Sequence, residues 1–265
     1  MYLISGEKEK IDVGTGFAMD KVAEGGEKGL RAYVCQELDY EIALRWQKDL
    51  VAKRKSGEIE DTLILLEHPP TYTMGSDQKW EHLLYPQDFL KSQGFSICKC
   101  DRGGDITYHG PGQLVVYPII RLRDSGLTPI GYVRLLEQII CDVLTMYNLE
   151  GQRKEGYPGV WLEDCKICAI GIGISRGVTF HGLALNVNPD LTHFQNIVPC
   201  GLAKFGVTSL ARELGFSPEM FIVKQQIIAS FERNLNVKCR VSIDQRMSGG
   251  VRHENGSEEK SVALP

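Results

Sequence analysis

The sequence predicts a single α+β domain in which helices pack against a largely antiparallel sheet. Segments with helical periodicity are set apart from strand-like runs, and they do not alternate with them as in a parallel βαβ fold. Two long strand-like runs are joined by the tight-turn sequence Ser175-Arg176-Gly177, which is typical of an antiparallel hairpin. At 265 residues, with 43% hydrophobic and 24% charged residues, the chain can bury a core without disulfides.

Three segments have the spacing of amphipathic helices. The first covers Leu38–Leu50, where a large apolar residue recurs at every fourth position, and it ends in a basic run before Gly57. The second covers Ile130–Tyr147, and the third covers Pro218–Leu235, with Ser217 as its expected N-cap. We expect these helices to lie together on one face of the sheet.

Apolar runs bounded by turn residues predict the strands of that sheet. They are Thr62–Leu66, Phe95–Lys99, Leu114–Leu122, Ile167–Ile174 and Val178–Val187. No composition shift divides the segment between the first strand and the last helix. We therefore expect one folded domain over residues 31–243, a flexible N-terminal extension over 1–30 and a flexible C-terminal tail over 244–265.

Composition argues against several classes of protein. The formal net charge is −4 and no basic block occurs, which argues against nucleic-acid binding. No run of 18 apolar residues occurs, so we expect no membrane association. The start of the chain resembles neither a signal peptide nor a transit peptide, and the eight cysteines are then expected to be reduced thiols. These observations favour a cytoplasmic protein.

The segment from Arg102 to Gln113 places four glycines and a proline between two apolar runs. Glycine has no Cβ, so such a segment allows the backbone to approach a ligand closely. The alternative is an ordinary irregular connection. The segment lacks the Gly-Lys-Ser/Thr sequence of a P-loop and the GxGxxG spacing of a dinucleotide fold, so nucleotide binding has no support here.

Two further segments carry reactive side chains. Cys165 and Cys168 have the spacing of half a zinc site, but no second pair matches them, so zinc is not favoured. Lys166 begins an apolar strand, where it either serves a reaction or extends its amine to water. Cys200 lies between Pro199 and Gly201, a setting that exposes a thiol, although most cysteines among apolar residues are only buried.

Four of these segments together resemble the lipoyl(octanoyl) transferases. RGGDITYHGPGQ, GVWLEDCKICAIG, FHGLALNV and IVPCG occur in the order found in that family, over a span from about Leu63 to Leu210. The family is related to biotin and lipoate protein ligases, so the resemblance implies their mixed, largely antiparallel fold. It also implies transfer of an octanoyl or lipoyl group from acyl carrier protein to a lysine of lipoyl domains, through a cysteine thioester.

The resemblance also implies roles for particular residues. Cys200 corresponds to the family's nucleophile and Lys166 to the lysine that lowers the pKa of this thiol and carries protons, with His181 in a supporting position. The implied substrate-binding residues are Arg102, Gly103, Gly104, Asp105, Ile106, Thr107, Tyr108, His109, Ala169, Ile170, Gly171, Gly182, Leu183 and Ala184. The implied acceptors are lipoyl domains of 2-oxoacid dehydrogenase complexes or the glycine cleavage H protein, and no cofactor or metal is implied. In a eukaryote the protein would lie in an organellar matrix or stroma.

The residue types suit this chemistry. A thiolate that first accepts an acyl group divides the transfer from thioester to amine into two easier steps, and a nearby ammonium favours the thiolate. His109 and His181 are either scaffold residues or proton carriers, and the oxyanion donors are amides near Cys200 or along Ala169–Gly171. Replacing Gly104 by Val is expected to shorten the preferred acyl chain. Two alternatives stay open: an ATP-dependent lipoate or biotin ligase, and a non-catalytic module that binds acyl carrier protein.

Overall fold

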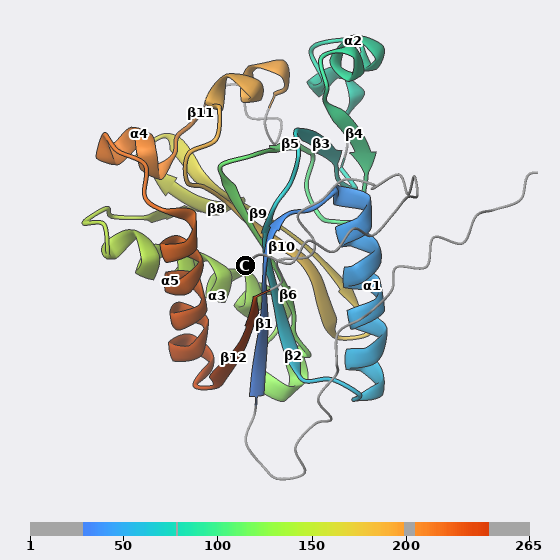
Figure 1. Ribbon diagram of the computed structural model, residues 1–265, viewed down its shortest axis with the longest axis vertical. Helices are drawn as coiled ribbons and strands as arrows, with labels where there is room; N and C mark the ends of the chain where they lie inside the picture. Colours follow the sequence, from blue (N-terminus) through green and yellow to red (C-terminus); the bar gives the residue numbers. More distant parts are fainter. Residues whose placement is uncertain (1–28, 78, 199–204, 244–265) are drawn as a thin grey trace, which may run out of the picture.

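The computed structural model describes residues 29–77, 79–198 and 205–243, and it is built around one twisted main sheet (Figure 1). Eight of its strands are, in spatial order, β12 (Lys238–Ile243), β1 (Gly29–Glu37), β2 (Asp61–Glu67), β6 (Gln113–Ile119), β10 (Val178–Asn186), β9 (Cys165–Ser175), β8 (Tyr157–Leu162) and β7 (Gln152–Lys154). A ninth, β11 (Gly206–Val207), pairs with β9 in parallel. The strand β1 is parallel to both β12 and β2, whereas the neighbours from β2 through β6, β10, β9 and β8 to β7 are antiparallel.

The helices are α1 (Tyr40–Ser56), α2 (Gln87–Ser92), α3 (Pro129–Thr145), α4 (Leu210–Leu214) and α5 (Met220–Leu235), and 3₁₀ helices cover Trp80–His82, Leu122–Ser125 and Leu191–Asn196. The helix α1 has a capping residue at each end. The Asp39 carboxylate accepts hydrogen bonds from its first amides, and Gly57 ends it in the left-handed conformation. The three predicted helices are confirmed as α1, α3 and α5, but the predicted Ser217 cap is wrong, because α5 begins later, behind Glu219.

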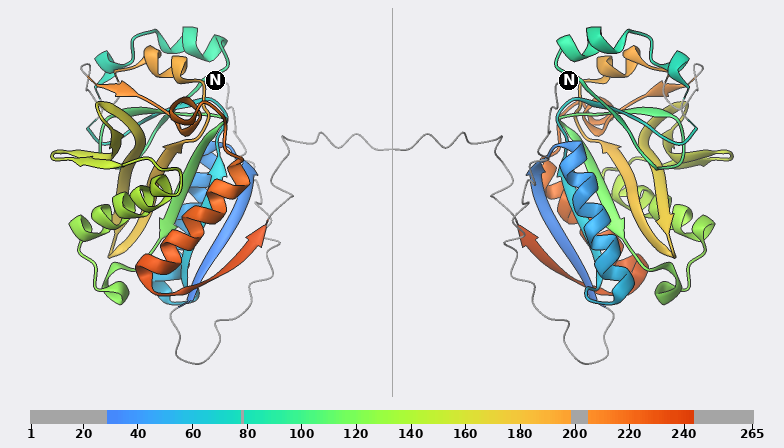
Figure 2. Two further views of the ribbon diagram at one scale, coloured as in Figure 1. Left: turned by 90° about the vertical axis from the view of Figure 1, so that its left-hand side faces the viewer. Right: turned by 90° about the vertical axis from the view of Figure 1, so that its right-hand side faces the viewer.

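Helices cover both faces of the main sheet, so the expectation of one covered face is wrong. The helix α1 packs on one face, against residues such as Ile64 and Tyr117, while α3 and α5 pack on the other, against Leu63 and Val116 (Figures 1 and 2). The physical reason lies in the central strands: β6 is buried throughout, β2 is buried at all but its two end residues, and neither strand alternates between buried and exposed residues. Such strands need a covering layer on each side.

A second, three-stranded sheet lies at one end of the main sheet, next to α2 (Figure 1). Its strands, in spatial order, are β4 (Ser96–Lys99), β3 (Thr71–Met74) and β5 (Ile106–His109). The predicted strand at Phe95–Lys99 is thereby confirmed as β4, whereas β3 and β5 had no counterpart among the expected strands. The glycine-rich segment therefore contains β5 and connects the small sheet to β6 of the main sheet.

The other four predicted strands are confirmed as β2, β6, β9 and β10, although β6 ends at Ile119. The strand β1 begins at Gly29, within the extension that we expected to run to residue 30. The rest of that extension and the expected tail over 244–265 lie outside the described residues. Among the described helices, none has both the length and the apolar character needed to cross a membrane.

Candidate active site

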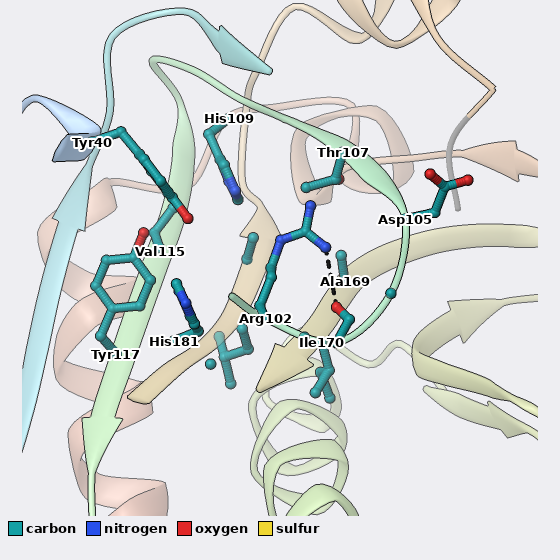
Figure 3. Close-up of a pocket in the computed structure, with 16 residues that line it drawn as sticks. Tyr40, Arg102, Asp105, Thr107, His109, Val115, Tyr117, Ala169, Ile170 and His181 are labelled. Atoms are coloured by element: carbon teal, nitrogen blue, oxygen red, sulfur yellow. Dashed lines mark hydrogen bonds between the residues drawn. The ribbon is translucent and has the colours of Figure 1, made fainter. Parts of the chain in front are cut away.

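A narrow cavity of about 60 Å³ lies where the glycine-rich segment crosses the main sheet (Figure 3). Its walls come from the segment after β4, from β5, and from the facing stretches of β6, β9 and β10, with one residue of α1. The lining residues are Tyr40, Arg102, Gly103, Gly104, Asp105, Thr107, His109, Val115, Tyr117, Ala169, Ile170, Gly171, His181, Gly182, Leu183 and Ala184.

This cavity brings together all the expected substrate-binding residues except two. Ile106 and Tyr108 do not line it; they are buried in a separate apolar cluster of the small sheet. Because side chains alternate between the two faces of a strand, Thr107 and His109 of β5 face the cavity while their neighbours face the other side. The prediction that every residue of this motif lines the substrate site is therefore wrong for Ile106 and Tyr108.

Three lining residues were missed by sequence reasoning: Tyr40, Val115 and Tyr117. Val115 and Tyr117 belong to β6, whose residues are all buried, so the apolar run of this strand did not show which of its side chains meet the cavity. Tyr40 comes from the first turn of α1, far from any of the motifs. Only the alternation along β6 offers a signal, since Val115 and Tyr117 are two residues apart.

Glycines allow the strands and the loop to approach one another at this site. A Cβ on Gly182 would collide with the carbonyl oxygen of Val116, and one on Gly171 would lie 3.0 Å from the carbonyl oxygen of Gly103. The loop is held against β9 by the amide of Gly103, which donates to the carbonyl oxygen of Ile172 at 2.9 Å. The glycines of these motifs thus serve close backbone contact around the cavity.

A buried chain of amides fixes the ring of His109. Asn186 donates from Nδ2 to the carbonyl oxygen of Thr208 at 2.9 Å, and its Oδ1 accepts from Nε2 of Gln113 at 2.9 Å. The Oε1 atom of Gln113 therefore accepts from His109 Nδ1–H at 2.7 Å. Burial holds the pKa of His109 well below its ordinary value, so the ring is neutral and its Nε2 faces the hydroxyl of Thr73 at 3.3 Å.

His181 is also held neutral and in one orientation. Its Nε2 donates to the Asp101 carboxylate at 3.0 Å, and burial lowers its pKa to about 4 although that hydrogen bond acts in the opposite direction. Its backbone adopts the left-handed region, with φ of +54°, which a residue other than glycine rarely adopts. The fixed orientation of both rings favours the scaffold interpretation of His109 and His181.

Lys166 lies at the start of β9, beside the narrow cavity. Its Nζ is 4.7 Å from the centre of the Trp161 ring and 3.4 Å from the carbonyl oxygen of Pro158. It lines a wider cavity of about 560 Å³, which shares Ile170, Gly171 and residues 103–105 with the narrow one. The amine and the narrow cavity are therefore connected through common walls.

Cys200, the expected nucleophile, lies outside the described residues. On one side of residues 199–204, the amide of Val198 donates to the carbonyl oxygen of His82 at 2.8 Å. On the other side, the ring of Phe205 lies 5.5 Å from that of Tyr157. His82 and Tyr157 both line the wider cavity that contains Lys166. The described chain on either side of residues 199–204 thus contacts walls of that cavity.

Comparison with known families identifies the type of domain. The model of the lipoyl protein ligase A/B catalytic domain matches residues 39–232, which is most of the chain. The chain belongs to this family. Within it, an octanoyltransferase of Chloroflexus aggregans is 48% identical over 204 residues, covering 76% of this chain and 92% of the relative. An octanoyltransferase of Desulforamulus reducens is 42% identical over 219 residues, covering 82% and 96%.

Solved structures show the same fold at low sequence identity. Lipoate-protein ligase A bound with ATP superposes with a TM-score of 0.67 at 16% identity, covering 84% of this chain and 91% of the ligase. A putative lipoate protein ligase from T. acidophilum with bound lipoic acid gives 0.64 at 17% identity, covering 84% and 91%. The ligase-like α+β fold implied by the sequence motifs is therefore confirmed.

Proposed function

We propose that this chain is an acyltransferase that moves octanoyl from acyl carrier protein to a lysine of lipoyl domains through a thioester on Cys200. The observation that carries the proposal is the shared wall between a narrow, buried cavity and a wider cavity that contains Lys166. Val115, Leu183 and Ala184 supply apolar walls in the narrow cavity. Burial of each CH₂ there contributes about 0.8 kcal/mol, so an eight-carbon chain is held by several kcal/mol.

The first half-reaction forms the acyl-enzyme. The Cys200 thiolate attacks the thioester carbonyl of octanoyl-acyl carrier protein, and the bond between the acyl carbon and the carrier sulfur breaks. The Lys166 ammonium gives a proton to the departing carrier thiolate and becomes a neutral amine. Its positive charge before this step favours the thiolate form of Cys200.

The second half-reaction regenerates both residues. A lysine amine of the lipoyl domain attacks the acyl carbon of the Cys200 thioester, forming the amide bond and releasing Cys200 as a thiolate. The proton lost by the attacking amine passes to the Lys166 amine, which becomes an ammonium again. Protons and charges balance over the cycle, which needs neither nucleotide nor metal because the thioester donor is already activated.

The ATP-dependent ligase is the main alternative, since its fold is the same. The identity to the ligase structures is 16–17%, whereas it is 42–48% to relatives named octanoyltransferase, which favours transfer over ligation. We extend the proposal to acceptors: lipoyl domains of 2-oxoacid dehydrogenase complexes or the glycine cleavage H protein. A structural neighbour, a bipartite lipoate protein ligase from Thermoplasma acidophilum, is described with its E2 lipoyl domain.

Intact-mass measurement tests the proposal directly. Incubation with octanoyl-acyl carrier protein, without ATP and with a chelator present, should add one octanoyl group, and peptide mapping should place it on Cys200. The Cys200→Ala variant should remain unmodified, while Cys165→Ala, which changes a thiol next to Lys166, should still be acylated. Addition that requires free octanoate and ATP would instead support a ligase. Binding of acyl carrier protein without any transfer would support the non-catalytic module.

A further inference from the structure

Transfer to the acceptor lysine releases more protons than Lys166 can take. At pH 7 a lysine with an ordinary pKa of about 10.4 is an ammonium, and only about one molecule in a few thousand has the free amine that attacks a thioester. Conversion of this ammonium to an amide removes two protons. Lys166, neutral after the first half-reaction, can accept only one of them. The proposed cycle therefore calls for a second base beside the acceptor amine.

A histidine and a carboxylate lie paired in the wall of the wider cavity. His82, at the end of the 3₁₀ helix Trp80–His82, is hydrogen-bonded through Nδ1 to the carboxylate of Asp105, and both residues line the cavity that Lys166 also lines. Their side chains are 17% and 10% exposed, so the pair is largely shielded from water. In Figure 3 the Asp105 carboxylate lies apart from the guanidinium and the two histidine rings of the narrow cavity.

The hydrogen bonds of Asp105 determine which ring nitrogen of His82 can accept a proton. Its Oδ1 accepts the backbone amide of Lys79 at 3.1 Å, and its Oδ2 accepts Nδ1–H of His82. A carboxylate held in this way fixes the orientation and the tautomer of the ring. In the neutral ring the lone pair is then on Nε2, which has no hydrogen-bond partner within the described residues. His82 thus has a free proton acceptor at the cavity.

The backbone of His82 lies beside the chain that leads to the expected nucleophile. Its carbonyl oxygen accepts the amide of Val198 at 2.8 Å, and the amide of Leu84 donates to the carbonyl oxygen of Asn196 at 2.9 Å. Val198 precedes Cys200 by two residues in the sequence. The pair of His82 and Asp105 is therefore held against the chain segment just before the nucleophile.

The residue type also suits a second base. An imidazole is the side chain whose ordinary pKa lies closest to neutral pH, so it can both take up and release a proton during turnover. Among the described residues that line the wider cavity, His82 supplies the only imidazole. The histidines of the narrow cavity are held in place by other partners, as described above, and they do not line the wider one.

We propose that His82, oriented by Asp105, is a second base of the active site: it takes the first proton from the ammonium of the acceptor lysine, and Lys166 takes the second. This inference rests on the proposed octanoyl transfer. An N–H bond of the ammonium breaks, its electron pair stays on the acceptor nitrogen, and the proton binds Nε2 of His82. The imidazolium then gives this proton to water. The balance is correct, because a thioester and an ammonium become an amide, a thiol and one free proton.

The His82→Asn variant tests this role in separate half-reactions. Asparagine keeps a nitrogen donor near the position of Nδ1 for Asp105, but it cannot take up a proton. The octanoyl-enzyme is formed from octanoyl-acyl carrier protein, freed of donor and mixed with a lipoyl domain at pH 7, and intact mass follows both steps. We expect acylation within a few-fold of the unmodified protein and transfer slowed about 10²–10⁴-fold. His193→Asn is the control: His193 also pairs with a carboxylate, that of Asp190, but lines neither cavity, so both steps should be unchanged.

Hydroxylamine distinguishes a missing base from a distorted site. It is a neutral amine at pH 7, so its attack on the octanoyl-enzyme, which gives octanoyl hydroxamate and free Cys200, needs no removal of a first proton. His82→Asn should therefore lose octanoyl to hydroxylamine as fast as the unmodified protein does. Equal slowing with hydroxylamine and with the lipoyl domain would overturn the proposal, and so would unslowed transfer to the lipoyl domain. Failure of the unmodified protein to become acylated would instead count against the proposed function.

The Asp105→Asn variant tests the orientation of the ring. Because the Lys79 amide needs an acceptor, the oxygen of the new side chain faces it and the new NH₂ group donates to Nδ1 of His82. The ring proton then moves to Nε2, which no longer accepts a proton. We expect the same slow transfer to the lipoyl domain with undiminished loss of octanoyl to hydroxylamine. Transfer at the unmodified rate would contradict the positioning role of Asp105. If His82→Asn does not fold, this variant, which keeps the ring, decides.

Discussion

Replacing Lys166 should separate catalysis from stability. Its amine contacts the Trp161 ring, 4.7 Å from the ring centre, and the carbonyl oxygen of Pro158 at 3.4 Å. A cation over an aromatic ring at a partly exposed site contributes about 0.5–1 kcal/mol, and a hydrogen bond contributes about 0.5–1.5 kcal/mol. Loss of these two contacts in Lys166→Met should lower the free energy of unfolding by about 1–2.5 kcal/mol. Loss of a general acid–base group costs about 10²–10⁴ in rate, equivalent to about 3–5 kcal/mol of activation free energy.

Lys154 offers a matched control for that experiment. Its amine lies 5.6 Å from the centre of the same Trp161 ring and pairs with the exposed carboxylate of Asp164. Lys154→Met thus removes a similar cation and should leave transfer within a few-fold of the unmodified protein. A third variant, Lys166→Arg, keeps the positive charge but cannot give up its proton, so it should retain more of the thiolate effect than of the proton transfer.

The assay follows the two half-reactions separately. Quenched intact-mass spectra give the rate of octanoyl addition to the enzyme, gel or mass analysis of a lipoyl domain gives the rate of transfer, and thermal unfolding reports the fold. If Lys166→Met transfers octanoyl as fast as Lys154→Met does, the proposed proton-carrying role is refuted. A loss of activity that follows a large drop in Tm would assign the lysine a structural role instead.

Two further predictions concern the stability of the fold at and around the site. Gly182→Ala should strongly lower Tm, because its Cβ would collide with the carbonyl oxygen of Val116. Gly103→Ala should be tolerated, since the nearest contact of its Cβ would be at 3.7 Å, and equal effects of the two variants in thermal unfolding would contradict the close-approach argument. Burial lowers the pKa of both His68 and His181 to about 4. Between pH 6.5 and pH 4 these two side chains are therefore protonated in the unfolded chain and neutral in the folded chain. The free energy of unfolding should fall over that range as the pH drops, by up to about 3 kcal/mol for each histidine. Urea titrations across that range would test this, and a flat profile would contradict it.

The sequence predicted the helices and most central strands because their periodicity comes from burial. It failed on the layering, since residues such as Leu63 and Ile64 are adjacent and both apolar, and a run of this kind does not show that its alternate side chains meet different helices. It also failed on β5, whose Thr107 and His109 look like loop residues until the facing cavity is known.

Within the site, the motifs predicted the backbone better than the side chains. Glycines such as Gly171 and Gly182 stand where strands approach closely, which a local sequence pattern can indicate. Tyr40 reaches the cavity and Gln47 reaches the backbone amide of His181 from α1 through the tertiary fold, and no local pattern marks them. The rest of the site therefore required the packing of α1 against the sheet, which depends on contacts far apart in the chain.

Gly104 shows how the structure changes the design of an experiment. The sequence suggested that a valine there would narrow the acyl site and shorten the preferred chain. Gly104 instead has a φ of +87°, which a β-branched residue adopts only with strain, so Gly104→Val should distort the loop and impair transfer at every chain length. Selection by length is better tested at Val115, an apolar wall of the narrow cavity that lies on the regular strand β6 and has no left-handed φ, so that a larger side chain there changes the cavity without straining the glycine loop.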